Sequence, residues 1–410
     1  MPQSHFRRSL ALLGTRRFGT FWFASLLANI GTWAQQVAQP WLLLSLGASP
    51  FVLGLDAFAL GAPVLLLTLV GGALADRRDR RRTIAVFQSF QALCPVLLVV
   101  LLLTGTVQPW VVIALSLVVG ITDALSMPSF QSIVPSIVER EQIPAGIALN
   151  TTQFNLSRIL GPAIAGVLMA SVGVVGAFAV SAASYLPFIL VALWVLPRAA
   201  ATPPEMPAMS AAQLRDRVLE ILREPVLRGA LLTVFTTAVL CAPLITFCPV
   251  LVKEDFQGSA GQFSAAVGAF GAGGLLGAIA LLTLNPAQDR RPVSSASALA
   301  YGAVVLLVAF NHWAWALPLL LALAGVAMTA SNASANALLQ AAAPQHLRGQ
   351  SVSLFMLAMR GGLALGSLLT GAVVHLLSVR EALLLNGVLA VLAQLAIARA
   401  WARAPGSAGR

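Results

Sequence analysis

Four ionisable residues lie inside long apolar stretches of the sequence: Asp56, Asp123, Arg158 and Arg360. A charge near the centre of a bilayer is costly unless it is paired or hydrated, so residues of this kind are functional candidates by default. Asp123 and Arg158 fall near the middles of consecutive apolar stretches, and adjacent antiparallel helices would bring them together. They predict either a substrate or proton site that faces a central cavity, or a static ion pair that holds one bundle.

The other two charges and the second half of the chain give weaker signals. Asp56 lies near one end of its stretch, where a structural acid is favoured over a proton carrier. Arg360 could hold an anionic substrate, or it could extend its guanidinium to the membrane surface or to backbone carbonyls. Asn332 and Asn336 are spaced by four, which suits interhelical hydrogen bonds as well as ligand contacts.

Polar and aromatic side chains form a stripe along the first apolar stretch. Asn29 and Gln36 are seven residues apart, so a helix places them on one face, with Trp33 near them. Gln35 and Gln39 add two more amides to the same stretch. The pattern predicts the wall of a polar cavity.

The elements that position these residues must lie in lipid. The 410-residue chain is 58% hydrophobic and 10% charged, whereas soluble proteins carry about 25% charged residues. A net charge of +11 would suit nucleic acid in a soluble protein. Here the arginines stand in short gaps between apolar stretches, where positive charge fixes topology. We therefore expect an integral membrane protein that does not bind nucleic acid.

Twelve stretches are long enough to cross about 30 Å of hydrocarbon. They lie at roughly 18–46, 51–75, 83–104, 109–130, 143–170, 174–196, 226–252, 261–284, 293–311, 313–341, 350–377 and 380–401. With the gaps assigned alternately to two sides, 21 arginines fall on one side, and only Lys253 and Arg380 fall on the other. This asymmetry predicts an even number of spans in the plasma or inner membrane, with both termini cytoplasmic.

The two halves of the chain resemble each other in sequence. The stretch from Gly161 to Gly166 and the stretch from Gly366 to Gly371 are 205 residues apart, and each follows an embedded arginine. A duplicated six-helix unit, with a pathway between the copies, is one explanation; chance glycine periodicity is the other. We expect an N-terminal bundle at 1–196, a cytoplasmic linker at 197–225 with an amphipathic helix at Gln213–Leu222, and a C-terminal bundle at 226–410.

The gap between the second and third stretches resembles the signature loop of the major facilitator superfamily, G-x-L-a-D-r-x-g-r-R-r. The matching residues include Gly72, Asp76, Arg77, Arg80 and Arg81. Asp79 stands where many members have glycine. The resemblance implies that Asp76 and the arginines close an inner gate, the alternative being a topology anchor alone.

Two further motifs resemble the branch of that superfamily that includes the enterobactin exporter and related drug and siderophore exporters. The form N-x-G-T-W-x-Q-x-x-A-x-x-W-L matches Asn29, Gly31, Thr32, Trp33, Gln36, Ala38, Trp41 and Leu42. The form A-L-N-x-x-x-x-N-x-x-R-x-x-G-P-A-x-A-G matches Ala148, Leu149, Asn150, Asn155, Arg158, Gly161, Pro162, Ala163, Ala165 and Gly166.

This resemblance implies an all-α membrane protein with twelve transmembrane helices in two pseudo-symmetric six-helix bundles. Asn155 then joins the residues of the central cavity. Gly161, Pro162 and Gly166, with Gly366 in the second half, form a conformational hinge, the alternative being a packing kink.

We expect no enzyme, metal site or cofactor, because the sequence has neither a G-x-x-x-x-G-K-[ST] loop nor an H-E-x-x-H motif. Transport would then run on an ion gradient, for which protons are the expected ion. The chain is expected to be a monomeric, secondary active exporter of a small amphipathic or hydrophobic molecule, drug- or siderophore-like, that works by alternating access. The alternatives are a facilitator or importer of a small solute, and a membrane sensor or scaffold that transports nothing.

Overall fold

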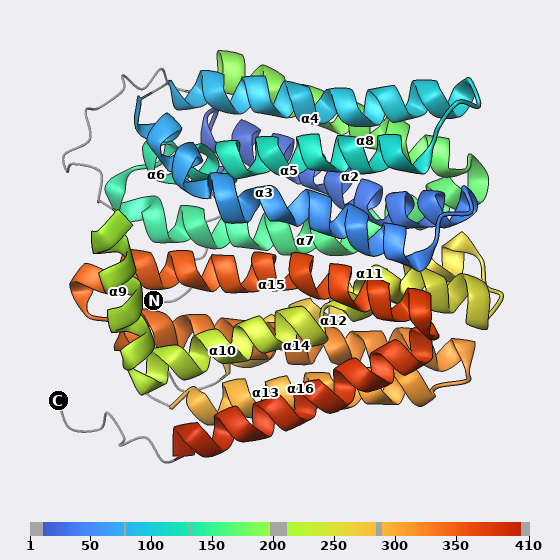
Figure 1. The fold of residues 1–410 in the computed structure, drawn as a ribbon. Helices are drawn as coiled ribbons and strands as arrows, with labels where there is room; N and C mark the ends of the chain where they lie inside the picture. The colour runs from blue at the N-terminus through green and yellow to red at the C-terminus, as the bar shows by residue number, and fades with distance from the viewer. Residues whose placement is uncertain (1–10, 78, 132, 197–210, 284–288, 403–410) are drawn as a thin grey trace. The chain divides into compact units, whose positions relative to one another are not determined.

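The computed structural model describes residues 11–77, 79–131, 133–196, 211–283 and 289–402. Every regular element among these residues is a helix, and none of them forms a β-strand (Figure 1). Long helices satisfy their backbone N–H and C=O groups internally, which lipid requires. The structure confirms the predicted all-α fold class.

Eleven stretches of the described chain are long and apolar enough to cross a membrane. The first long helix, α2 (Phe18–Ser45), is not among them, since Asn29 and three glutamines make it more polar. Its 28 residues nevertheless extend about 42 Å, more than the roughly 30 Å of hydrocarbon. Counting α2, the twelve stretches expected from the sequence are all present.

Among the described residues, the first half of the chain contains six long α-helices and one short one. They are α2 (Phe18–Ser45), α3 (Pro50–Arg77), α4 (Arg80–Leu103), α5 (Pro109–Gln131), α6 (Val134–Ile137), α7 (Ile143–Ser171) and α8 (Val174–Trp194). α2 packs against α7 and α8, while α4 packs against α5 and α8. The rings of Phe21, Phe130 and Phe188 lie 5.4 to 5.9 Å apart and join α2, α5 and α8.

The second half repeats this arrangement. Its helices are α9 (Ala211–Arg223), α10 (Pro225–Leu240), α11 (Pro243–Val250), α12 (Ala260–Leu282), α13 (Arg291–Phe310), α14 (Leu317–Ala342), α15 (Arg348–Leu376) and α16 (Val379–Ala402). α10 contacts α15 and α16 as α2 contacts α7 and α8, and α13 contacts α14 and α16 as α4 contacts α5 and α8 (Figure 1). The sequence repeat is therefore a repeat of helix packing as well.

One predicted stretch, 226–252, is interrupted. α10 ends at Leu240 and α11 begins at Pro243, whose nitrogen has no hydrogen to donate to the preceding turn. The chain then continues through a π-helical segment, Leu251–Asp255.

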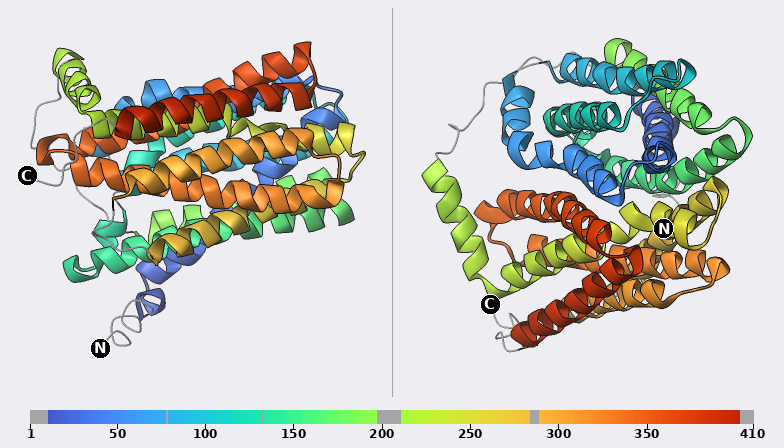
Figure 2. Two further views of the ribbon diagram at one scale, coloured as in Figure 1. Left: turned by 90° about the horizontal axis from the view of Figure 1, so that it is seen from below. Right: turned by 45° about the vertical axis from the view of Figure 1, so that its right-hand side comes forward.

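The amphipathic helix predicted at 213–222 is confirmed as α9, which crosses the ends of α10 and α15 steeply (Figure 2). Its Ile221 side chain is fully buried in an apolar cluster of the second half. Glu220 Oε1 lies 3.3 Å from His346 Nε2. The rest of the predicted linker, 197–210, lies outside the described residues.

The chain divides into two compact units whose limits differ from the limits of the sequence repeat. The first unit comprises Met1–Ala48, Ala62–Glu205 and Ala260–Gly268, and the second comprises Ser49–Gly61, Met206–Ser259 and Ala269–Arg410. Each half of the sequence thus contributes part of one helix to the other unit.

Close helix contacts explain why Ser49–Gly61 belongs to the second unit and Ala260–Gly268 to the first. In the first unit, Phe263 of α12 stacks on Trp41 of α2 with a centroid distance of 5.8 Å. A Cβ atom at Gly166 of α7 would lie 2.7 Å from Cβ of Ser264. In the second unit, a Cβ atom at Gly54 of α3 would lie 2.4 Å from the carbonyl oxygen of Ser367 in α15. Small residues therefore let these helices approach each other closely.

Arg380 connects three helix ends in the second unit. Its Nη1 donates to the carbonyl oxygens of Ala309 (3.1 Å) and Asn311 (2.5 Å) at the end of α13. Its Nε lies 2.5 Å from Asp255 Oδ2, and its guanidinium carbon lies 5.5 Å from the centroid of the Phe256 ring. One side chain thus satisfies carbonyls that the end of a helix leaves without partners.

Replacing Arg380 by alanine is expected to lower the free energy of unfolding by about 2 kcal/mol, since charge-assisted hydrogen bonds are lost and Asp255 loses its ion-pair partner. Lysine should restore only part of this stability, because it lacks the forked guanidinium. Thermal unfolding in detergent measures both. Equal unfolding midpoints for the alanine variant and the wild type would show that the Arg380 side chain does not stabilise the fold.

Candidate functional site

A buried hydrogen-bonded network joins α2, α5 and α8 in the first unit. Gln35 and Gln39 of α2 are each less than a tenth exposed. Ser181 Oγ of α8 donates to Gln35 Oε1 (2.9 Å), and Gln39 Nε2 donates to Ser116 Oγ of α5 (2.6 Å). Gln35 Nε2 also donates to Gln39 Oε1 (3.4 Å). The two amides therefore fix the positions of three helices with polar contacts inside an apolar unit.

A second polar contact lies one turn along α2. The hydroxyl oxygens of Thr32 and Tyr185 are 3.0 Å apart. Tyr185 is buried and Asp123 of α5 is half-buried. The acid predicted as a coupling residue thus lies half-buried within an apolar membrane span.

Sequence reasoning did not identify Tyr185. Its stretch of sequence is strongly apolar, and a tyrosine there is most simply a core residue. A usable signal was present, since Ser181, Ser184 and Tyr185 share one face of α8. That face is turned toward α2, where Ser181 and Tyr185 form the hydrogen bonds described above.

Two of the predicted cavity residues meet between α2 and α7. The guanidinium carbon of Arg158 lies 5.4 Å from the centroid of the Trp33 ring, within cation–π range. Phe154 packs edge-on against Trp33, with a centroid distance of 5.9 Å. A Cβ atom at Gly161 would lie 2.4 Å from Cβ of Trp33, so this approach of the helices depends on glycine. The pairing of Arg158 with Asp123 stays a prediction.

The other predicted residues of the first unit lie on the same two helices, α2 and α7, and differ in exposure. Asn29 is half-buried and Gln36 is exposed, while the glutamines beside them are buried. Asn155 is half-buried, and its amide donates to the carbonyl oxygen of Thr151 within α7 (3.0 Å). Pro162 is buried within α7. α2 therefore turns the amides of Gln35 and Gln39 toward its neighbours, whereas the amide of Gln36 is exposed.

In the part of the signature loop that the structure describes, Asp79 caps the following helix. Asp79 precedes α4, and its Oδ1 accepts a hydrogen bond from the backbone N–H of Arg81 (3.1 Å). Aspartate is a preferred residue at this position, which accounts for its presence where related loops have glycine. Nη1 of Arg81 donates to the carbonyl oxygen of Leu193 (2.6 Å) and so satisfies the end of α8.

The other signature residues are described only by their backbone. Gly72, Asp76 and Arg77 lie in α3 and Arg80 begins α4, and their side chains lie outside the described structure. The second half has a counterpart that sequence reasoning missed. Asp289 Oδ1 accepts from the backbone N–H of Arg291 (2.9 Å), and Asp289 Oδ2 accepts from its Nε (2.8 Å).

The predicted cavity residues of the second unit lie in α14 and α15. Arg360 of α15 and Asn332 of α14 are both half-buried. The Asn332 Oδ1 atom is buried without a hydrogen-bond partner. Gly366 provides the counterpart of Gly161, because a Cβ atom there would lie 2.1 Å from the carbonyl oxygen of Val239 in α10. The close contact of α7 with α2 therefore recurs between α15 and α10.

In the described part of the chain, no three His, Cys, Asp or Glu side chains are grouped so that they could hold a metal ion. The three cysteines are buried and free.

The family model described as a transmembrane secretion effector matches residues 7–407. The chain belongs to this family of major facilitator transporters. The transporter is 30% identical to the multidrug efflux pump Tap of Mycolicibacterium fortuitum, over 85% of this chain and 87% of that protein. It is 25% identical to the staphyloferrin A transporter of Staphylococcus aureus, with the same coverage. It is also 25% identical to the enterobactin exporter EntS of Salmonella choleraesuis, over 88% of this chain and 87% of that protein.

A solved structure supports the fold of the transporter. The nucleoside transporter NupG superimposes with a TM-score of 0.72 at 14% identity, over 94% of this chain and 99% of that chain. The transporter is thus a multi-pass membrane protein for small-molecule substrates, and it is not an enzyme. The resemblance seen in its motifs is confirmed at the level of the family.

Proposed function

We propose that this transporter exports a small amphipathic or hydrophobic organic molecule, drug- or siderophore-like, in exchange for protons. The observation that carries the proposal is the half-buried carboxylic acid Asp123 inside the apolar span Pro109–Phe130. Ionisable residues inside membrane spans commonly mark substrate or ion pathways. Relatives named as a multidrug efflux pump and as an enterobactin exporter support the direction and the kind of cargo.

The substrate in this proposal contacts the open side of α2. Trp33, with Arg158 over its ring, offers an aromatic surface and a positive charge side by side. Asn29 and Gln36 add hydrogen-bonding groups on the same helix. A molecule with an apolar body and a few polar groups matches such a surface. Asn155, Arg360 and Asn332 complete the proposed cavity.

The conformational cycle in this proposal is alternating access by the two sequence repeats, 1–196 and 226–410. Gly161, Pro162, Gly166 and Gly366 allow the helices to shift against one another. Asp76 and the arginines of the signature loop close the inner gate. The excess of arginine on one side supports cytoplasmic termini in a plasma or inner membrane. The working unit is a monomer that binds no nucleic acid and needs no cofactor.

Reconstituted protein tests the proposal directly. Inside-out proteoliposomes with an acidic interior are expected to take up fluorescent amphipathic dyes or metal-free siderophores, and a protonophore should abolish that uptake. Empty liposomes with the same pH gradient are the control. Uptake that proceeds unchanged with the protonophore would exclude proton exchange and favour a facilitator. A protein that transports none of these probes, although it binds them, would favour a sensor.

A further inference from the structure

Tyr185 of α8 is a buried phenol to which the proposed transport cycle assigns no part. Its hydroxyl oxygen lies 3.0 Å from that of Thr32 in α2. Thr32 Oγ1 in turn donates to the carbonyl oxygen of Ala28 (2.9 Å). A hydroxyl has a single proton, and the proton of Thr32 is already given to the carbonyl. The proton between the two hydroxyls therefore comes from Tyr185, and Thr32 accepts it.

The hydrogen bonds thus run in one direction, from Tyr185 through Thr32 to the Ala28 carbonyl. The carbonyl at the end of this chain can only accept, which fixes the direction. The phenolic oxygen keeps lone pairs that can accept one more hydrogen bond. Toward any further group, Tyr185 is therefore an acceptor.

A hydrogen bond between α2 and α5 determines which residue of α5 lies level with this phenol. Gln39 of α2 donates to Ser116 of α5 (2.6 Å). Thr32 lies seven residues before Gln39, and Asp123 lies seven residues after Ser116. Seven residues are close to two helical turns, so each pair shares one face of its helix. Because α2 and α5 are the first and fourth spans and run antiparallel, Asp123 is level with Thr32 and Tyr185.

Few other ionisable groups come from the helices that pack around this level. α2 carries no charged side chain after Arg17, and α8 carries none. Beyond the arginines of its first turn, α4 brings the thiol of Cys94, which donates to a carbonyl of its own helix (3.3 Å). α7 brings Arg158. Away from the helix ends of these described spans, Arg158 is therefore the charged group that can compete with Tyr185 for the Asp123 carboxyl.

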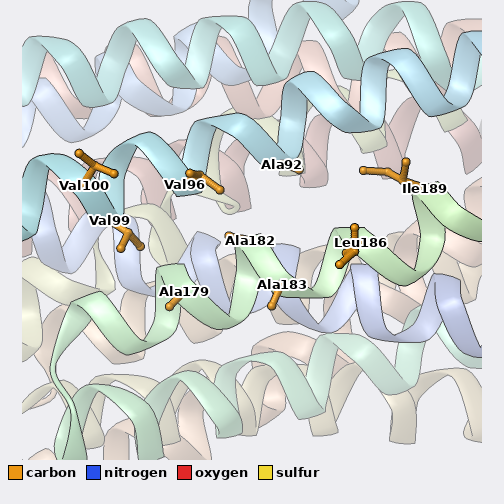
Figure 3. Close-up of a pocket in the computed structure, with 9 residues that line it drawn as sticks. All are labelled: Ala92, Val96, Val99, Val100, Ala179, Ala182, Ala183, Leu186 and Ile189. Carbon is orange, nitrogen blue, oxygen red and sulfur yellow. The ribbon is translucent and has the colours of Figure 1, made fainter.

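Another side of α8 is entirely aliphatic. An apolar groove lies there between α4 and α8 (Figure 3). Its lining side chains are those of Ala, Val, Leu and Ile residues, and on α8 they include Ala182, Ala183 and Leu186. Tyr185 does not line this groove and shares the polar face of α8 with Ser181, which bonds to α2. The groove therefore offers the phenol no alternative partner.

The two protonation states of a carboxyl group differ in how they can meet this phenol. A protonated carboxyl has an O–H that donates, whereas an ionised carboxylate only accepts. A phenolic oxygen whose own proton is given to Thr32 therefore matches the acid and not the carboxylate. Two acceptors that faced each other would leave buried polar atoms unpaired, which is costly.

We propose that Tyr185 is a positioning residue whose hydroxyl oxygen accepts a hydrogen bond from protonated Asp123 and so ties α8 to α5 while the proton is bound. This inference rests on the proposed function, in which Asp123 carries the proton. When Asp123 gives its proton to water, the electron pair of the O–H bond stays on the carboxylate, which can then only accept. The contact is lost at that step, and α5 is released from α8.

Infrared difference spectroscopy of the full-length protein in liposomes tests the contact without transport. A carbonyl-stretching band of a protonated carboxyl that is present at acidic pH and missing from Asp123→Asn belongs to Asp123. A carboxyl that loses its hydrogen-bond partner absorbs at higher wavenumber, so Tyr185→Phe should move this band upward. The matched control is Tyr301→Phe, which removes the hydroxyl of the chain's other tyrosine, buried in the second unit. It should leave the band in place.

Transport gives a second measurement. Gradient-driven uptake by Tyr185→Phe is expected to fall about fivefold, which corresponds to the loss of one neutral hydrogen bond. Equilibrative exchange of substrate should be retained, because Asp123 is still present and the phenyl ring still fills its place. Tyr301→Phe should keep the wild-type ratio of the two rates. Equal ratios for Tyr185→Phe and the wild type would contradict the positioning role.

The spectra also distinguish failure of this inference from failure of the proposed function. An Asp123 band that is present but unmoved in Tyr185→Phe overturns the contact and leaves proton exchange standing. A carboxylate that stays ionised at the lowest pH at which the protein is folded indicates an ion pair with Arg158 and overturns both. Should Tyr185→Phe fail to fold, Thr32→Val frees the phenolic proton for the Asp123 carbonyl oxygen and should move the band to lower wavenumber. An unmoved band in that variant overturns the contact as well.

Discussion

Replacing Asp123 by asparagine is expected to reduce pH-gradient-driven transport by about tenfold or more, because the variant loses the carboxylate that would carry the proton. The fold should survive, since asparagine has nearly the same shape and Asp123 is only half-buried. Initial rates in proteoliposomes, measured with and without an imposed pH gradient, distinguish loss of proton coupling from loss of folded protein. Gradient-driven uptake should be lost, while equilibrative exchange of substrate should remain.

Two further variants make this result specific to Asp123. Asp123→Glu keeps the acid and should recover part of the coupled rate. Asp216→Asn removes a carboxylate that is about two-thirds exposed on α9 and should transport like the wild type. Wild-type coupled transport by Asp123→Asn would remove the proton role from this residue, and Asp56 would become the next candidate.

The second large effect is expected from Gly366→Ala and Gly161→Ala. The added Cβ atom would lie 2.1 Å from the Val239 carbonyl oxygen in the first case and 2.4 Å from Cβ of Trp33 in the second. Neither a backbone oxygen nor a Cβ atom, which is fixed to the backbone, can move aside as the end of a flexible side chain can, so the helices must separate. We expect each variant to lose about 1 to 3 kcal/mol of stability and most of its transport activity, with Gly366→Ala the more severe.

Gly268→Ala is the matched control for these two variants. It lies in α12 with nothing within 4 Å of an added Cβ atom, so it should match or slightly exceed the stability of the wild type. Thermal unfolding in detergent and dye transport in liposomes give the two readouts. If Gly366→Ala and Gly268→Ala unfold at the same temperature, close helix approach at Gly366 is not required.

The fold was largely predictable because a chain in lipid must satisfy its backbone hydrogen bonds internally, as helices do. Length and hydropathy indicate the long helices, and the alternation of arginines requires an even number of them. That alternation also requires α2, although its amides make it less apolar than the other spans. The break before Pro243 shows where hydropathy is insufficient, since an apolar stretch does not reveal whether one helix or two fill it.

The site was predictable in part. Residue type and spacing predicted Arg158 beside Asp123 and, separately, Trp33 beside Asn29 and Gln36. The structure brings Arg158 onto Trp33. Spacing alone could not tell which amides of α2 are buried, because burial depends on where α7 and α8 pack. Tyr185 was missed for a related reason, since its role follows from the Thr32 hydroxyl on another helix.

Asp79 shows how a departure from a familiar pattern can be resolved by local physics. It stands where related loops have glycine, and its carboxylate caps α4 at the backbone N–H of Arg81. Asp289 and Arg291 repeat the hydrogen bond between an aspartate carboxylate and the backbone N–H two residues further along the chain.

The exchange of Ser49–Gly61 and Ala260–Gly268 between the compact units bears on how this polypeptide is made. During synthesis the first unit has to wait for a segment that leaves the ribosome more than two hundred residues after its own first helix. Either half, produced alone from a split gene, would lack a segment that packs in its compact unit. Co-expressed fragments would have to find each other in the bilayer before either could mature.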